Sequence, residues 1–159
     1  MKERQHVKSN YPGKNNGFVV WCEVRQQYLE LRVLKVWQIF SMIEVMLPEI
    51  RMILLEDANK NWNPHGGRPG GGGRAQGAGW IKGLCNTYME YMESIGIADD
   101  EYLTEEGAPV YRKIKADTAW TKKDEQYVFN HTGIRIEGAK THPNQNLRDA
   151  LMMFRFHGF

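Results

Sequence analysis

The stretch LELRVLKVWQIFSMIEVMLPEIRMILL, from Leu29 to Leu55, carries the strongest periodic pattern in the chain and decides the fold that the sequence predicts. Apolar residues recur in it at alternating spacings of four and three, an average period of about 3.5 residues. This period is typical of a long, coiled-coil-like helix that packs along a seam with another helix and forms an oligomer. The predicted seam, and with it the oligomerisation surface, consists of Leu29, Val33, Val36, Phe40, Ile43, Leu47, Ile50 and Leu54.

Pro48 interrupts this pattern. Inside a helix, proline removes one backbone hydrogen bond and crowds the preceding turn, at a cost of about 3 kcal/mol. We therefore expect either a kink at Pro48 or a second helix that begins there. A β interpretation is disfavoured because strict alternation of apolar and polar residues never lasts in this stretch. Further apolar residues beside the seam, such as Trp37 and Met42, predict a helix buried on more than one side.

A glycine-rich stretch, NPHGGRPGGGGRAQGAG at 63–79, separates this segment from the rest of the chain. Glycine loses the most backbone entropy on ordering, so we expect a flexible linker there. Beyond it, the apolar spacing from Trp80 predicts a helix that Gly96 ends.

Three shorter helices are expected nearer the C-terminus. One begins at Pro109, one is capped by Thr121 and ended by Gly133, and one is capped by Asn144 or Asn146. The predicted fold is therefore mainly α, a long heptad-patterned helix and a small helical module joined by a glycine-rich linker. The expected organisation is a flexible basic arm at 1–17, a long helical oligomerisation segment at 18–58, the linker at 59–79 and the small helical module at 80–159.

Charge is distributed unevenly along the chain. The net charge of +2 creates no strong overall field, and 42% hydrophobic residues are typical of a globular protein. Residues 1–17 carry +3 and residues 59–83 carry +4, whereas residues 84–110 carry −7. Basic charge in flexible segments has no packing role, so this distribution favours contact with phosphate groups.

Two patterns bear on nucleic-acid binding. The glycine-rich stretch lacks the Gly-Lys-Ser/Thr sequence of a phosphate-binding loop, but its arginines are suited to following a phosphate backbone. The two short helices on either side of ADTAWT, 116–121, are candidates for a helix-turn-helix, although this connection is longer than the usual tight turn. The predicted nucleic-acid-binding residues are Arg68, Arg74, Lys82, Arg112, Lys113, Lys122, Lys123 and Gln126.

The sequence predicts no catalytic residue, metal ligand or cofactor. His131, Asn146 and His157 occur in the order of a histidine–asparagine–histidine nuclease module. Asn146 and His157 would lie roughly 16 Å apart along one helix, too far for both side chains to bind one ion. Isolated histidines at the surface or at helix ends are the simpler interpretation.

Two remaining features bear on location. Cys22 and Cys85 lie within apolar patterns far apart in the sequence and are expected to be buried free thiols of a reducing compartment. No uninterrupted apolar run is long enough to span a membrane, so we expect no membrane association and a cytoplasmic location.

Three functions follow from these observations. The first is a small oligomeric helical protein that associates with nucleic acid through its basic segments and C-terminal helices. The second is a structural or assembly subunit, or an adaptor, that binds copies of itself or a helical partner protein and has no catalytic activity. The third is a metal-dependent nuclease, which rests only on the histidines.

Overall fold

The computed structural model describes residues 15–57, 72–102 and 106–158, with the side chains of residues 72–82 left out. It is an α/β protein, so the prediction of a mainly α fold is wrong. In chain order the elements are β1 (Asn16–Cys22), β2 (Gln27–Leu34), α1 (Val36–Met46), the 3₁₀ turn η1 (Leu47–Glu49), β3 (Met52–Glu56), α2 (Gly72–Ser94), β4 (Ala98–Asp99), the 3₁₀ turn η2 (Asp100–Tyr102), β5 (Val110–Ile114), α3 (Glu125–Thr132) and α4 (Asn144–His157).

The strands β1 and β2 form an antiparallel hairpin. A four-residue turn at 23–26 joins them, and Gln26 adopts a left-handed φ of 52° in it. Trp21 and Tyr28 lie opposite each other, and their rings meet edge to face at 4.7 Å between centroids. Such cross-strand aromatic pairs stabilise a hairpin and help to fix its register.

The other three strands form a parallel sheet in the order β3-β5-β4. Parallel strands of one sheet need crossover connections, and α2 lies in the connection from β3 to β4, the two strands on either side of β5. Met52 pairs with Val110 and Glu56 with Ile114, so β3 and β5 end together. This register brings the residues that follow both strands to one edge of the sheet.

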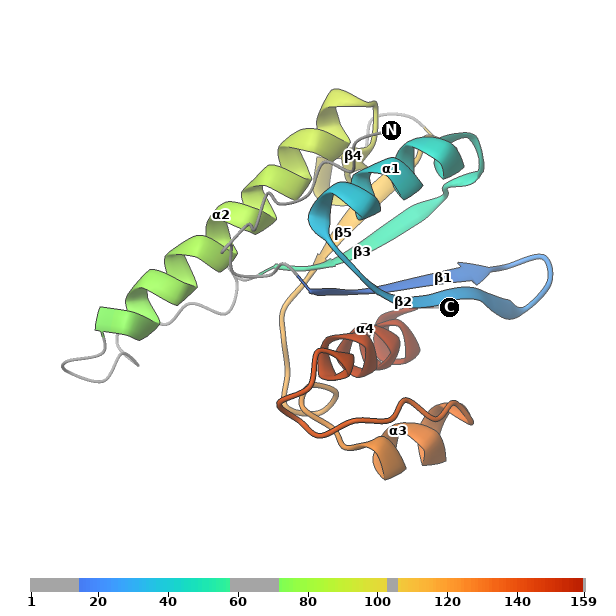
Figure 1. Cartoon of the computed structure of the whole chain (residues 1–159). Helices are drawn as coiled ribbons and strands as arrows, with labels where there is room; N and C mark the ends of the chain where they lie inside the picture. The colour runs from blue at the N-terminus through green and yellow to red at the C-terminus, as the bar shows by residue number, and fades with distance from the viewer. Residues whose placement is uncertain (1–14, 58–71, 103–105, 159) are drawn as a thin grey trace, which may run out of the picture.

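Helices cover both faces of the strands (Figure 1). One core cluster joins α1 and α2 to one face, with Ile43, Met92 and Tyr111 buried at its centre. A second cluster joins α4 to the opposite face, with Trp120 and Leu151 buried at its centre. The architecture is therefore a layer of strands between two layers of helices.

The hairpin and the parallel sheet share this middle layer. Phe18 of β1 and Ile53 of β3 pack against the first cluster, whereas Val19 and Leu54, the next residue in each strand, pack against the second. Both sheets thus present alternate side chains to the same two cores. Within the described residues no strand pairing joins β1 to β3.

The predicted long helix is divided among four elements, which removes the coiled-coil-like seam. Leu29 and Val33 lie in β2, Val36 to Ile43 in α1, Leu47 in η1 and Leu54 in β3, while Ile50 lies in the link before β3. Ile43 is buried inside the chain's own core at 3% exposure, whereas Leu29 is 47% exposed. The expected interruption at Pro48 is present, because α1 ends at Met46 and Pro48 lies in η1.

The helical prediction failed because strands covered on both faces do not alternate. In β3, Met52 to Leu55 are all apolar, as expected for a strand between two helical layers. A stretch this rich in apolar residues contains a four–three spacing whether its parts are strands or helices. Seven of the eight seam residues belong to the two core clusters or pack against them, whereas Leu29 is exposed, and the assignment of the whole stretch to one helix was wrong.

The helix predicted to follow the glycine-rich stretch is confirmed as α2. Gly96 follows it with a left-handed φ of 92°, and its N–H donates to Glu93 at 3.2 Å. The N–H of Ile97 donates to the Met92 carbonyl at 2.9 Å, which completes a Schellman cap. Residues 59–71 of the predicted linker lie outside the described residues. From Gly72 onward, the backbone of the predicted linker belongs to α2.

The C-terminal helices are confirmed in part. The helix predicted from Pro109 is wrong, because Val110–Ile114 is the strand β5. The next helix, α3, begins after Asp124 rather than Thr121, since the Asp124 carboxylate accepts the Tyr127 N–H, and it ends at Gly133 as predicted. The last helix, α4, is also confirmed.

Candidate functional site

Two carboxylates from distant parts of the chain face one open pocket. Glu56 is the last residue of β3, and Asp149 lies in the second turn of α4. The remaining lining residues come from the segment that follows β5. The pocket has a volume of about 320 Å³ and is lined by Glu56, Lys115, Ala116, Asp117, Thr118, Thr121, Lys122 and Asp149.

The parallel sheet places Glu56 at the rim of this pocket. The ladder between β3 and β5 continues past Glu56, because the Asp57 N–H donates to the Ile114 carbonyl at 2.9 Å. The thiol of Cys85, on α2, contacts the Glu56 carbonyl at 3.3 Å and packs the helix against the end of the strand. In open α/β sheets, ligands bind at the carboxyl ends of the parallel strands, where Glu56 lies.

Asp149 is held by two hydrogen bonds to the same oxygen. Its Oδ1 accepts the backbone N–H of Lys122 at 2.9 Å and the side-chain amide of Gln145 at 2.9 Å. Lys122 adopts a left-handed φ of 56°, a strained conformation for a residue other than glycine. Backbone strain of this kind is concentrated at functional sites, where the surrounding structure maintains it.

Both carboxylates of the pocket have a raised pKa. Desolvation by the surrounding protein, followed by the negative charge of Asp149, raises the pKa of Glu56. Desolvation also raises the pKa of Asp149, opposed by its hydrogen bonds from Gln145 and Lys122 and by the positive charge of Arg148. Perturbed titratable groups that face one pocket are typical of a functional site.

Two lysines add positive charge to the pocket. Lys115 and Lys122 are exposed, line the pocket and form no ion pair within the described part of the chain. Asp117, between them, accepts the Ala119 N–H on Oδ1 at 2.7 Å and so shapes the turn. Carboxylates, which can bind a cation, and lysines, which can bind an anion, therefore line the same pocket.

The structure separates the predicted nucleic-acid-binding residues. Arg112 pairs with Asp100 at 2.6 Å, and Lys113 pairs with Asp99 at 3.0 Å and with Glu101 at 3.5 Å. These two cations of β5 are engaged by the acidic block at 84–110. Of the five predicted residues whose side chains are described, only Lys122 lines the carboxylate pocket.

The other predicted contacts lie elsewhere. Lys123 places its ammonium 4.7 Å from the centre of the Tyr127 ring, and Gln126 donates to Asn130 at 2.7 Å along α3. Arg68 lies outside the described residues, and Arg74 and Lys82 lie in the part of α2 whose side chains are not described. The helix-turn-helix prediction is wrong, because its first helix is the strand β5.

The histidine–asparagine–histidine set does not form a site. His131 stacks on Tyr127 at 4.1 Å, Asn146 donates to the Asn15 carbonyl at 2.6 Å, and His157 lies edge-on to Trp120. Within the described ranges, no three histidine, cysteine, aspartate or glutamate side chains gather as a metal site would require.

Sequence reasoning missed Glu56 and Asp149. A signal for Glu56 is present in MILLED, 52–57, where a short apolar run ends directly in two acids, as at the carboxyl end of a buried strand. Its assignment to a helix hid that signal. Asp149 has no comparable local signal, because acids are common on the exposed faces of helices.

Three further findings complete the description of the chain. None of the helices in the described ranges is long and apolar enough to cross a membrane. Both cysteines are free thiols, as predicted, with Cys85 buried and Cys22 half-buried. Comparison with protein-family models, with curated proteins and with solved structures finds no match.

Proposed function

We propose that this protein binds a divalent cation, Mg²⁺ or Mn²⁺, between Glu56 and Asp149 and hydrolyses phosphodiester bonds of nucleic acid at that site. One observation carries the proposal. Two carboxylates line the same open pocket at the carboxyl ends of parallel strands as two lysines that form no ion pair with the described residues. The proposal revises the expectation that the chain has no metal ligand.

The donor set fits a hard cation. Carboxylate oxygens are the ligands that Mg²⁺ and Mn²⁺ prefer, and Mg²⁺ is commonly bound by one or two carboxylates with water and substrate phosphate as the other ligands. Asp117 also lines the pocket, but no three acidic, histidine or cysteine side chains of the described residues lie close enough together to hold one ion. Most of the coordination sphere would therefore remain open to water and phosphate. The open pocket provides that space.

The raised pKa values point the same way. Two carboxylates that repel each other and are partly desolvated gain when a positive charge lies between them. A bound divalent cation polarises a phosphoryl oxygen and lowers the pKa of a coordinated water. Glu56 and Asp149 would hold the cation, and their own charges would be compensated by it.

Lys115 and Lys122 extend the site to the nucleic-acid backbone. Both are exposed at the pocket, so their ammonium groups can contact the phosphates on either side of the scissile one. Hydrolysis requires a water oxygen to bond to phosphorus while the bond to one sugar oxygen breaks and that oxygen takes up a proton. The proposal keeps the predicted association with nucleic acid and moves its centre from the C-terminal helices to this pocket.

Metal binding and cleavage test the proposal together. Titration calorimetry of the full chain with Mn²⁺ should show binding, and Glu56→Gln or Asp149→Asn should abolish it. Cleavage of single-stranded and double-stranded DNA and RNA should need Mg²⁺ or Mn²⁺ and fall by about 100-fold or more in either variant, the scale of a lost metal contribution. Glu90→Gln, the same change at an exposed residue of α2, should change neither result.

Each alternative outcome has a defined meaning. Wild-type protein that binds no Mn²⁺ overturns the proposal. Binding of nucleic acid without cleavage, weakened by salt, favours simple association instead.

Two free cysteines and an action on nucleic acid both accord with the predicted cytoplasmic location.

Self-association is a weaker candidate than it was from the sequence. Its predicted seam does not exist as one surface. The exposed apolar residues that the structure offers on α1 are Trp37, at 64% exposure, and Val45, at 80%. Light scattering of the purified protein measures the oligomeric state, and Trp37→Ser should lower it if α1 forms an interface.

A further inference from the structure

The helix α4 contains a buried polar network directly behind Asp149. Arg148 is fully buried at 0% exposure, and Gln145 is buried at 7%. The Arg148 guanidinium donates to the Gln145 side-chain oxygen from Nε at 3.1 Å and from Nη2 at 2.8 Å. The Gln145 amide nitrogen then donates to Oδ1 of Asp149 at 2.9 Å. A chain of hydrogen bonds thus runs from the protein interior to one oxygen of the pocket carboxylate.

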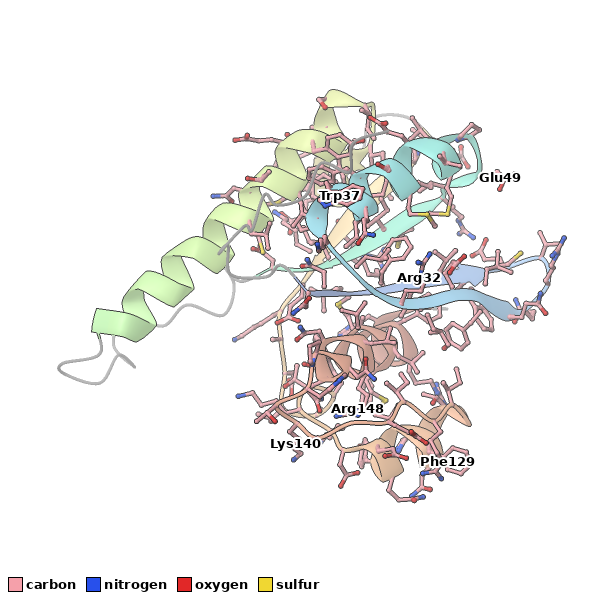
Figure 2. All side chains as sticks on the ribbon, in the orientation of Figure 1. Arg32, Trp37, Glu49, Phe129, Lys140 and Arg148 are labelled. Atoms are coloured by element: carbon pink, nitrogen blue, oxygen red, sulfur yellow. The ribbon has the colours of Figure 1, made fainter. Side chains whose placement is uncertain are left out.

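Every acceptor that Arg148 contacts directly is a neutral oxygen. Nη1 donates to the Ile136 carbonyl at 2.7 Å, and Nη2 reaches the Ala139 carbonyl at 3.3 Å. These carbonyls lie in the segment between α3 and α4, so the guanidinium fixes that segment to α4; Figure 2 shows Arg148 where the two meet. A buried cation is costly unless its donors are hydrogen-bonded, and these four hydrogen bonds use four of the five N–H donors of Arg148.

Gln145 is oriented by this contact. An amide side chain has an acceptor end and a donor end, and Arg148 occupies the acceptor end with two hydrogen bonds. The donor end must then point away from Arg148, toward Oδ1 of Asp149 and the Lys123 carbonyl at 3.1 Å. Because a guanidinium can only donate hydrogen bonds, Arg148 determines which end of the Gln145 amide faces Asp149.

The result is an asymmetric carboxylate. Both hydrogen bonds to Asp149, from Gln145 and from the Lys122 N–H, end on Oδ1. No hydrogen bond within the described residues ends on Oδ2. We propose that Gln145, oriented by Arg148, is a positioning residue that holds Oδ1 of Asp149 and leaves Oδ2 as the single ligand atom for the cation. This inference rests on the function proposed above.

A measurement without metal separates this inference from the proposed function. The Lys122 N–H is protected from hydrogen exchange by its bond to Oδ1, so its exchange rate reports whether Asp149 stays in place. Gln145→Leu should speed exchange of the Lys122 amide by about 10-fold or more. Gln126→Leu, the same change on the exposed face of α3, should leave that rate unchanged.

Metal affinity provides the second readout. Gln145→Leu should weaken Mn²⁺ binding by about 10- to 100-fold, the usual cost of losing a residue that orients a metal ligand, while the protein stays folded. Gln145→Asn keeps the amide, with its donor and acceptor ends, on a shorter side chain, and it serves as the second variant if the leucine variant does not fold. We expect the same faster Lys122 exchange and the same weaker Mn²⁺ binding.

The outcomes are distinguishable. Unchanged Lys122 exchange in the Gln145 variants overturns the positioning role, whatever the metal does. Faster Lys122 exchange in a protein whose wild type binds no Mn²⁺ supports the positioning role and overturns the proposed function.

Discussion

Charged residues gather at two places along β5, and the two clusters are built in opposite ways. Beside the body of the strand, Arg112 and Lys113 meet acids of the β4–η2 region at 2.6 to 3.5 Å. Beyond its carboxyl end, Glu56 and Asp149 line one pocket, and the charge of Asp149 contributes to the raised pKa of Glu56. Opposite charges pair in the first cluster, and like charges meet in the second.

The difference separates a cluster with a structural role from one for which we propose a functional role. In the first cluster each buried charge has a partner, which is the condition under which a protein tolerates buried charge. In the second, the fold maintains a repulsive pair, a desolvated environment and a strained Lys122 backbone. Unfavourable electrostatics of this kind are retained where an activity needs them, at a cost in stability.

The largest expected effect comes from breaking the structural cluster. Lys113→Met leaves Asp99, which is 7% exposed, without its closest partner at 3.0 Å. We expect the free energy of unfolding to fall by about 3 kcal/mol, the scale for a buried pair that loses one member. Urea denaturation followed by circular dichroism measures this. An unchanged urea midpoint would show that water solvates the Asp99 carboxylate well enough to replace its ion pair with Lys113.

The functional cluster should respond in the opposite direction. Glu56→Gln removes the repulsion with Asp149 and should stabilise the protein at neutral pH by up to about 1 kcal/mol, the limit for solvent-screened charges. Thermal unfolding measures the gain. A lower melting temperature than that of the wild type would mean that Glu56 stabilises the fold and that the pair is not repulsive.

The gain from Glu56→Gln should depend on pH. The folded-state pKa of Glu56 is raised above its ordinary value of 4.5, so the wild type is favoured at low pH and loses stability as pH rises through the folded pKa. The difference in melting temperature between Glu56→Gln and the wild type should therefore be small near pH 4 and grow toward pH 7. A difference that is constant with pH would exclude ionisation of Glu56 as the cause.

The smallest effect is expected at the exposed edge of the structural cluster. The side chain of Arg112 is 42% exposed, and its pair with Asp100 is screened by water. Arg112→Gln should cost less than about 1 kcal/mol, and added salt should reduce that cost further. A loss as large as that of Lys113→Met would place the two pairs in one cooperative network.

Sequence reasoning succeeded where an element has a single buried face. The helix α4 buries Leu147 and Leu151 on one face against the strands, and α2 ends at a glycine that its cap requires. It failed across 29–55, where strands and helix are covered by the same two cores and no element presents a clean polar face. Arg112 and Lys113 were predicted to bind nucleic acid. Their acidic partners in η2 and β4 could not be identified from the sequence.

The amino-acid sequence was sufficient to locate the apolar stretch that forms the core, the break at Pro48, the free thiols and the helices with local end signals. Those properties depend on side chains a few residues apart. The meeting of Glu56 with Asp149 depends on the tertiary structure, because the parallel pairing of β3 with β5 and the packing of α4 beneath the strands bring them together. Local patterns record which residues are buried, whereas the partner of each charge is decided only when distant segments pack.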